Sequence, residues 1–280
     1  MLEVAVRPRG PYSLALSARF AGDATRTFRD GVFTANLSGE LAAATQTPDG
    51  SVVVRGESAA AIERLRFVLA LDDDHTPFLR RFADDPLLGE SVRVLRGLRP
   101  VRTATVAHAL LRAFCGQLVD SATARRIERH VVAAGRETRG RLHAPPTRES
   151  LGRLAPAELR ALGLHARRAA ALVRVCRSLD LERLHGLPTP AIVARLGRER
   201  GLGPWSLGVL CLQGLGRFDH GLVGDLGLIK LCAALHGRRA EAHDTAELLE
   251  PYGEWAGLAS VYLLAGYGRG LLPLPRPAAA

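Results

Sequence analysis

The pattern of hydrophobic and polar residues changes character near residue 72. Before this point, apolar and polar positions alternate in short stretches, most clearly at residues 2–6 and 51–55, as they do in strands that bury one face. Residues 27–35 and 41–46 predict a further strand pair with turn residues around Asp30-Gly31 and Ser38-Gly39. Ser58 precedes a stretch with helical spacing. Residues 1–72 therefore predict a small α+β domain with a mostly antiparallel sheet.

From residue 73 onward, apolar residues recur every three or four positions, which is the spacing of helices with one buried face. The predicted helices cover residues 76–83, 103–119, 121–134, 156–162, 167–179, 191–200, 204–213, 226–235, 245–252 and 255–265. We therefore expect an all-helical core over residues 73–272, so that the whole chain is an α+β protein. Residues 273–280 lack periodicity and predict a disordered tail.

Composition points to a polyanionic partner. The chain carries a net charge of +10, and its 47% apolar content is enough for a sizeable core. No apolar run approaches the roughly 20 residues of a membrane-spanning helix, and no signal peptide is recognisable, so we expect a cytoplasmic protein. The four cysteines lie far apart in apolar contexts, which predicts buried, reduced thiols rather than a zinc site or an iron–sulfur cluster.

A glycine-rich segment stands between two predicted helices. Gly201 and Gly203 permit the backbone conformations of a very short turn, and Pro204 suits the first position of the following helix. The free amides at such a helix start form a site for a phosphate group. From the spacing alone, an ordinary turn between two helices is the simpler interpretation.

One acidic residue, Asp225, precedes the apolar helix predicted at residues 226–235. Spacing alone favours an N-cap, in which the carboxylate accepts hydrogen bonds from the first amides of the helix. The helix dipole also stabilises the ionised carboxylate, so an N-cap and a catalytic role are compatible. Asp219 is a nearby competitor, but its loop context favours a turn residue.

Together these segments resemble a known family. The run Gly201-Leu202-Gly203-Pro204-Trp205-Ser206, followed by Gly224-Asp225, is similar to the helix–hairpin–helix, Gly/Pro-rich loop and Asp (HhH-GPD) signature of DNA glycosylases. Within that superfamily the chain most resembles the bacterial 3-methyladenine DNA glycosylase II (AlkA) type. The segments that carry this further likeness are residues 116–119, 159–164, 225–230 and 255–259. The resemblance implies two helical subdomains in the core, with the DNA cleft between them.

The resemblance also implies roles for residues around the expected cleft. Asp225 would be the catalytic carboxylate, which stabilises the positive charge left on the sugar as the base departs. Trp205, Trp255 and Val209 would line the base pocket, and Val209 stands where the best-known members have a tyrosine. Core packing is the alternative interpretation for both tryptophans.

A further set of roles concerns how DNA would be held. Leu118 would fill the space that the flipped base leaves, although an ordinary core leucine is the alternative, and Gln117 would be its DNA-facing or structural neighbour. The residues that would bind the DNA backbone are Gly201, Leu202, Gly203 and Ser206. The family holds a monovalent cation at the hairpin carbonyls, so we expect Na⁺ or K⁺ there, no metal bound by side chains and no other cofactor.

The placement of lysine bears on the reaction type. Lys230 is the only lysine among the 38 Lys and Arg residues. Glycosylases that also cleave the strand use a lysine in the second hairpin helix, where this chain has Trp205, and Lys230 is expected on a different helical face from Asp225. The resemblance therefore implies a monofunctional enzyme.

The expected function is that of a monomeric base excision repair enzyme acting on double-stranded DNA. It would flip out alkylated purines of the 3-methyladenine and 7-methylguanine type and hydrolyse their N-glycosidic bond. Two alternatives stay open: a glycosylase for deaminated or other lesions, and a non-catalytic helix–hairpin–helix protein that binds DNA or senses damage.

Overall fold

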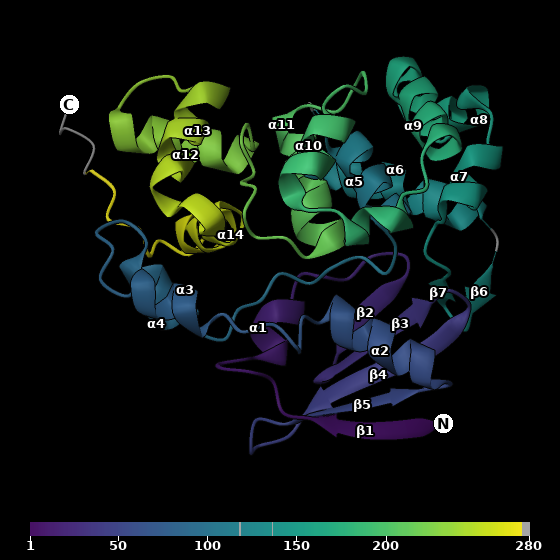
Figure 1. Ribbon diagram of the computed structural model, residues 1–280, viewed down its shortest axis with the longest axis horizontal. Coiled ribbons are helices and arrows are strands. Elements are labelled where there is room, and N and C mark those ends of the chain that lie inside the picture. The colour runs from purple at the N-terminus through teal and green to yellow at the C-terminus, as the bar shows by residue number, and fades with distance from the viewer. Residues whose placement is uncertain (118, 136, 276–280) are drawn as a thin grey trace.

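The computed structural model describes residues 1–117, 119–135 and 137–275, and Figure 1 shows a small sheet domain beneath a larger helical part. The sheet has five antiparallel strands in the order β1-β5-β4-β3-β2. The strands are β1 (Leu2–Val6), β2 (Arg26–Arg29), β3 (Val32–Leu37), β4 (Glu40–Gln46) and β5 (Val52–Gly56). The helices of this domain are α1 (Leu14–Ala18) and α2 (Ala59–Val68), and the side chain of Ser58 caps α2 as predicted. The predicted α+β class is confirmed.

Two tight turns make three strands where the sequence predicted one pair. Asp30 and Gly31 have φ of 50° and 77°, and Ser38 and Gly39 have φ of 58° and 93°. Positive φ at both central residues is the geometry of two-residue hairpin turns, whose twist matches that of the flanking strands. The apolar stretch at residues 27–35 therefore folds back at Asp30-Gly31 and forms both β2 and β3.

The helical part contains two groups of helices, with α11 between them (Figure 1). The first group comprises α5 (Val106–Gly116), α6 (Ser121–Ala134), α7 (Arg148–Arg153), α8 (Pro156–Ala161), α9 (Ala166–Ser178) and α10 (Thr189–Leu196). The second comprises α3 (Thr76–Arg81), α4 (Gly89–Val94), α12 (Leu226–His236), α13 (Ala242–Leu249) and α14 (Ala256–Tyr267). Each group buries its own apolar cluster, and α11 (Pro204–Val209) contributes residues to both.

Several details differ from the sequence prediction. The first long helix begins at Val106, after its cap Thr105, rather than at residue 103. Asp120, not Ser121, caps α6, because its carboxylate accepts hydrogen bonds at 2.9 Å from the amides of Ala122 and Thr123. The pattern also missed four short elements: the hairpin of β6 (Thr138–Arg139) and β7 (Leu142–His143), and the 3-10 helices η1 (Glu182–Gly186) and η3 (Glu250–Trp255).

A π-helical segment, η2 (Leu210–Leu215), continues α11 where the sequence predicted an unbroken α-helix.

The described end of the chain also differs from the prediction. Leu274 packs against the second helical cluster, so residues 273–275 do not form part of a detached tail, and residues 276–280 lie outside the described residues. The four cysteines are buried and unpaired, as predicted. None of the described helices has the length and hydropathy that crossing a bilayer requires.

Candidate active site

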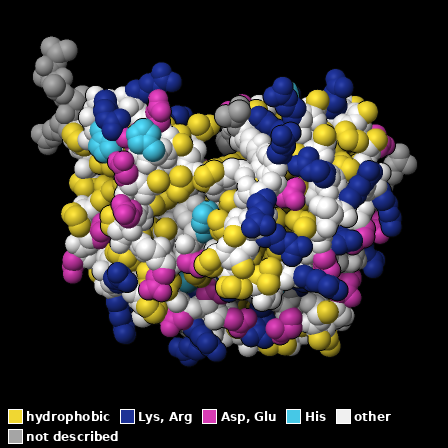
Figure 2. All heavy atoms as spheres, turned by 45° about the horizontal axis from the view of Figure 1, so that its top comes forward, with side chains coloured by type: hydrophobic (Ala, Val, Ile, Leu, Met, Phe, Trp, Pro, Cys, Tyr) yellow, Lys and Arg dark blue, Asp and Glu magenta, His cyan; other side chains and the backbone are white. Residues whose placement is uncertain are grey.

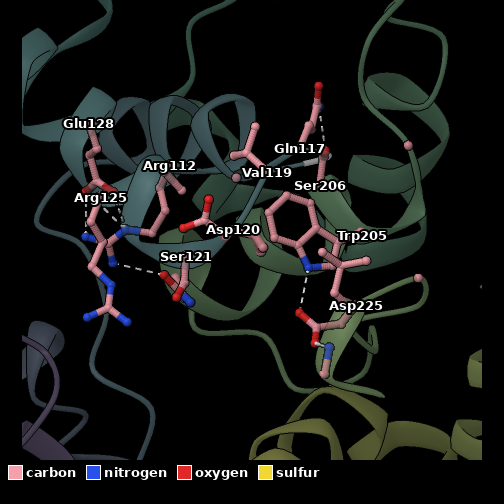
Figure 3. Close-up of a pocket in the computed structure, with 18 of the residues that line it drawn as sticks. Arg112, Gln117, Val119, Asp120, Ser121, Arg125, Glu128, Trp205, Ser206 and Asp225 are labelled. Atoms are coloured by element: carbon pink, nitrogen blue, oxygen red, sulfur yellow. Dashed lines mark hydrogen bonds and ion pairs between the residues drawn. The ribbon is translucent and has the colours of Figure 1, made fainter. Parts of the chain in front are cut away.

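A cleft of about 1310 Å³ opens between the two groups of helices and reaches the amino-terminal domain. Its walls come from four places: the loop before β2, the α5–α6 turn, the hairpin with the start of α11, and the start of α12. Figure 3 shows Trp205 and Asp225 at one end of this cleft and Arg112 and Glu128 at the other. In Figure 2, Lys and Arg side chains are denser over the half of the molecule that contains α6 to α9. The cleft therefore lies beside a basic surface.

The glycine hairpin is fastened to α5 by hydrogen bonds. Gly201 has φ of 97°, and a Cβ there would lie 3.2 Å from the ring of Phe114, so both the backbone and the space require glycine. The Nε2 atom of Gln117 donates to the carbonyl of Gly201 at 2.6 Å and to the hydroxyl of Ser206 at 2.9 Å. Gln117 thus holds the hairpin in place, which is the structural one of its two predicted roles.

The hairpin residues differ in what they can offer to a ligand. Leu202 and Ser206 are buried, and the amide of Leu202 donates to the carbonyl of Glu199. Their side chains and the Leu202 amide are therefore not available to a DNA backbone, and a contact through the Ser206 amide stays a prediction. Gly203 is exposed, and its amide donates to no residue that the structure describes. Gly203 is thus the hairpin position that presents a free donor.

Asp225 caps α12 and faces the cleft at the same time. Its Oδ1 atom accepts hydrogen bonds from the amides of Gly227 at 2.8 Å and Leu228 at 3.3 Å. Its Oδ2 atom accepts one from Nε1 of Trp205 at 3.0 Å (Figure 3). No Lys, Arg or His among the described residues lies within 4.0 Å of this carboxylate. Neutral donors therefore orient the carboxylate without cancelling its charge.

The indole of Trp205 is seated on a glycine. A Cβ built on Gly116 would lie 2.5 Å from Cη2 of this ring, so any larger residue would push the ring away. Val209, one helical turn later, is buried and also lines the cleft, and its role in a base pocket stays a prediction. Trp205 is half-buried and serves as the link between the α5 end and Asp225.

Comparison with known proteins finds no family model that matches this chain. The chain is 27% identical over 205 residues to the DNA-3-methyladenine glycosylase of Bacillus subtilis, covering 69% of this chain and 67% of that protein. It is 29% identical over 208 residues to a probable bifunctional transcriptional activator/DNA repair enzyme AlkA of Mycobacterium tuberculosis. That alignment covers 72% of this chain and 42% of the mycobacterial protein, so the chain spans less than half of that relative.

Two solved structures share the fold over nearly the whole chain. The 3-methyladenine DNA glycosylase from Archaeoglobus fulgidus superposes with a TM-score of 0.78 at 20% identity, covering 95% of this chain and 98% of that one. The 8-oxoguanine glycosylase/lyase of Clostridium acetobutylicum, in complex with double-stranded DNA, superposes with a TM-score of 0.79 at 15% identity, covering 96% and 99%. The chain therefore has the fold of these DNA glycosylases. Its sequence relatives are of the AlkA type.

Two of the residues expected at a glycosylase site lie elsewhere or outside the described chain. Trp255 does not line the cleft; it packs in the second helical cluster, with its ring centroid 5.9 Å from that of Phe78. Its position fits core packing, the alternative, and a role for Trp255 in the base pocket stays a prediction. Leu118 lies outside the described residues, and its neighbours Gln117 and Val119 both line the cleft.

Lys230 lies on the wall of the same cleft as Asp225, not on a face turned away from it. The five-residue separation on α12 suggested a different face, but the cleft is wide enough to include both. Lys230 is exposed, and none of the described carboxylates pairs with it within 4.0 Å. No lysine occurs in α11, where the resemblance to strand-cleaving glycosylases would require one; Trp205 occupies the expected position.

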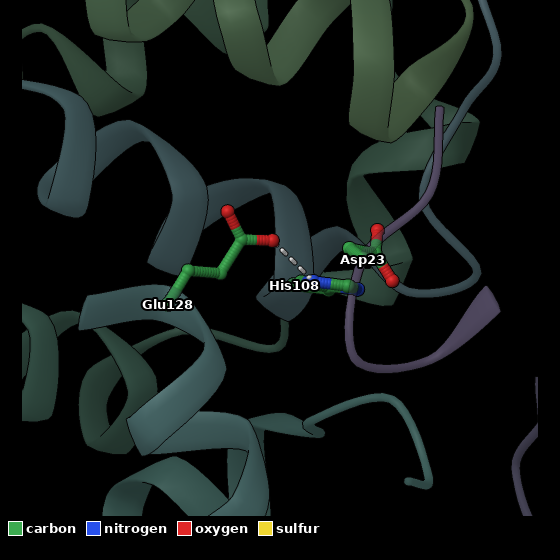
Figure 4. Close-up of side chains that lie close together, drawn as sticks. All are labelled: Asp23, His108 and Glu128. Carbon is green, nitrogen blue, oxygen red and sulfur yellow. Dashed lines mark hydrogen bonds and ion pairs between the residues drawn. The ribbon is translucent and has the colours of Figure 1, made fainter. Parts of the chain in front are cut away.

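Sequence reasoning missed an ionic cluster at the far end of the cleft. It consists of Asp23, Arg26, His108, Arg112 and Glu128, contributed by the amino-terminal domain, α5 and α6. Figure 4 shows three of these side chains converging between the domains. The one available signal was the pair of polar residues His108 and Arg112, four apart in an otherwise apolar helix, which puts them on one face.

The charges in this cluster balance. Burial by itself would raise the pKa of Asp23, but the charges of Arg26 and Arg112 outweigh it and hold the pKa well below its ordinary range. Burial likewise opposes ionisation of Glu128, and the charge of Arg112 together with the hydrogen bond from His108 lowers its pKa to about 2. Both carboxylates are therefore ionised and neutralised by two guanidinium groups.

This cluster has the composition of a metal site but not its electrostatics. One ligand atom from each of Asp23, His108 and Glu128 lies within 4.8 Å of the others. However, Arg112 donates to Asp23 Oδ2 at 2.7 Å and to Glu128 Oε1 at 2.7 Å, and Arg26 lies 3.0 Å from Asp23. A metal cation would have to displace two positive side chains, so these residues do not fit one.

Proposed function

We propose that this protein is a monofunctional DNA glycosylase of base excision repair that removes alkylated purines. The single observation that carries the proposal is Asp225, an ionisable carboxylate on a cleft wall that is held by neutral donors and paired with no cation. Such a group complements a positive charge that arrives with the substrate. The sequence relatives named as 3-methyladenine glycosylases support the same reaction class.

The chemistry follows from how Asp225 is held. As the bond between base and sugar breaks, positive charge develops on the sugar, and a preorganised carboxylate stabilises that charge without reorganising. The bonds from Gly227 and Leu228 fix Oδ1, whereas Oδ2 accepts one bond from Trp205 and keeps a lone pair for the reacting centre. In our proposal this oxygen faces the sugar, or orients the water that attacks it.

Substrate choice rests on the aromatic wall. Trp205 offers a ring face in the cleft, and an electron-poor, positively charged alkylated base is attracted to such a face. With Trp255 outside the cleft and Val209 beside Trp205, the described wall is less aromatic than the resemblance suggested. Structural neighbours include 8-oxoguanine enzymes, so another lesion is the second candidate, and a non-catalytic damage sensor is the third.

DNA would be gripped next to this site. The amide of Gly203 and the basic side chains of Arg125 and Arg129, which line the cleft on α6, are suited to phosphate groups. The Na⁺ or K⁺ expected at the hairpin stays a proposal; the carbonyls of Arg200 and Gly201 already accept bonds from Arg174 and Gln117. We also propose that the protein acts as a monomer in the bacterial cytoplasm, as its bacterial relatives suggest.

The test is release of bases from DNA treated with a methylating agent. Wild-type protein should release 3-methyladenine and 7-methylguanine, and Asp225→Asn should bind the same DNA with similar affinity but release neither. Equal release by both proteins would refute the role of Asp225. Borohydride should trap no covalent adduct with DNA, since a trapped adduct would show lyase chemistry and point to Lys230.

A further inference from the structure

One polar residue in the cleft has no role in the function proposed above. Gln213 lies in η2, and with Trp205 and Val209 it forms a row of cleft-lining residues spaced four apart. Residues with this spacing share one helical face. Gln213 therefore lies two turns further along this helical segment than Trp205, next to Arg112.

The orientation of the Gln213 amide is set by its neighbour. Nη1 of Arg112 lies 3.0 Å from Oε1 of Gln213. A guanidinium group only donates hydrogen bonds, so the atom facing it must be the amide oxygen and not the nitrogen. The Nε2 group, with its two N–H donors, is therefore on the other side of the amide. Among the described residues it has no acceptor, although the side chain is half-buried.

The side chain of Arg112 is held by other hydrogen bonds, so it keeps the amide of Gln213 in this orientation. Its Nη2 donates to Asp23 and Glu128, both at 2.7 Å, and its Nε donates to Glu128 at 3.1 Å. Glu128 is also bonded to His108 at 2.8 Å. The ionic cluster, which spans the amino-terminal domain, α5 and α6, thus acts as a rigid support for one neutral donor in the cleft.

We propose that Gln213 is a specificity-determining residue that donates a hydrogen bond to the keto oxygen of an extruded, alkylated guanine. This inference rests on the proposed function and adds a preference within its substrate class. Guanine carries an acceptor oxygen at C6, whereas adenine carries a donor amino group at that position. A fixed N–H donor therefore favours alkylated guanines and opposes alkylated adenines at the far edge of the base.

The experiment compares two products from the same methylated DNA. Release of 7-methylguanine and 3-methyladenine is measured for wild type, for Gln213→Glu and for Gln213→Met. Glutamate keeps an acceptor for Arg112 but removes both donors, and methionine keeps the volume without a donor. In each variant we expect the ratio of 7-methylguanine to 3-methyladenine to fall by about tenfold, the loss that one hydrogen bond of about 1.4 kcal/mol represents.

The ratio separates recognition from stability, because a variant that is merely less folded loses both products equally. Thermal melts and DNA affinity of each variant are the companion measurements. An unchanged product ratio in active variants would overturn this inference and leave the proposed function standing. Release of neither base by the wild-type protein would overturn the proposed function and, with it, the inference.

Discussion

The substitution Gly116→Ala tests the link between Trp205 and Asp225 without touching either residue. An alanine Cβ would lie 2.5 Å from Cη2 of the indole, whereas ordinary contacts begin at 3.4 Å, so the ring must move by about 0.9 Å (3.4 minus 2.5). A shift of that size disrupts the 3.0 Å bond from Nε1 to Oδ2, because the ring can no longer keep both the distance and the angle that this hydrogen bond needs. The carboxylate then loses one of its three donors.

The expected effect is on catalysis and not on folding. A hydrogen bond to a charged group contributes about 1.5–3 kcal/mol. If its loss is fully expressed in the transition state, base release slows by roughly 10- to 150-fold. Alanine favours a helix more than glycine does, so the end of α5 should not be weakened. DNA affinity should change little, because the hairpin contacts of Gln117 do not involve the ring.

The assay is single-turnover release of 7-methylguanine at saturating enzyme, with Gly186→Ala as the matched control. A Cβ on Gly186 would meet nothing within 4 Å. Because the chain has two tryptophans, a Trp255→Phe background leaves Trp205 as the only indole, whose fluorescence reports the ring movement directly. A Gly116→Ala protein with a displaced ring and an undiminished rate would refute the link between ring position and catalysis.

Two further perturbations probe the supports of the cleft. Glu128 has a pKa of about 2 in the folded protein against an ordinary value of 4.5, so its contribution to stability is complete above pH 4.5 and is lost as pH falls through 2. The free energy of unfolding, measured with urea, should fall between pH 6 and pH 3 in the wild-type protein. In Glu128→Gln this fall should be about 2 kcal/mol smaller. An equal fall in both proteins would contradict the ion pairing of Glu128. Replacing Gln117 by alanine removes the bonds to Gly201 and Ser206 and should weaken DNA binding about tenfold, with a smaller effect on single-turnover release. Fluorescence anisotropy with labelled duplex measures the first effect, and unaltered affinity would argue against a role for this clamp.

The sequence predicted the features whose determinants are local. The hairpin at Gly201 and Gly203 and the cap at Asp225 depend on residues within a few positions of one another, so spacing reveals them. The sequence did not predict the ionic cluster, because its members are far apart in the chain. Asp23 and Arg112 are 89 residues apart and meet only when the sheet domain packs on α5. The position of Trp255 outside the lining of the cleft was not predictable either, since a tryptophan before an apolar helix suits a pocket wall and a core equally well.

The π-helical turn is likewise invisible to periodicity. Its residues continue the apolar spacing of α11, and only the close packing of Gly214 against Ala109 of α5 shows how tightly this segment is held. A single extra residue in a helical turn changes the direction of the side chains that follow, and such turns are frequent at functional sites. Gln213 was not among the residues expected at the site because its partner Arg112 is 101 residues away and meets it only when this segment packs on α5.

The ion pair between Asp23 and Arg112 has a consequence for truncated variants of this protein. Deleting the sheet domain would remove one of the two anions that neutralise Arg112 and strip cover from the neighbouring helices. Arg26 would leave together with Asp23, so Arg112 would keep the balancing charge of Glu128 but would lose one acceptor, and its guanidinium group would be held less firmly beside Gln213. Hybrids made by joining the helical half to the sheet of a relative should therefore work only when the new sheet brings its own carboxylate to that spot.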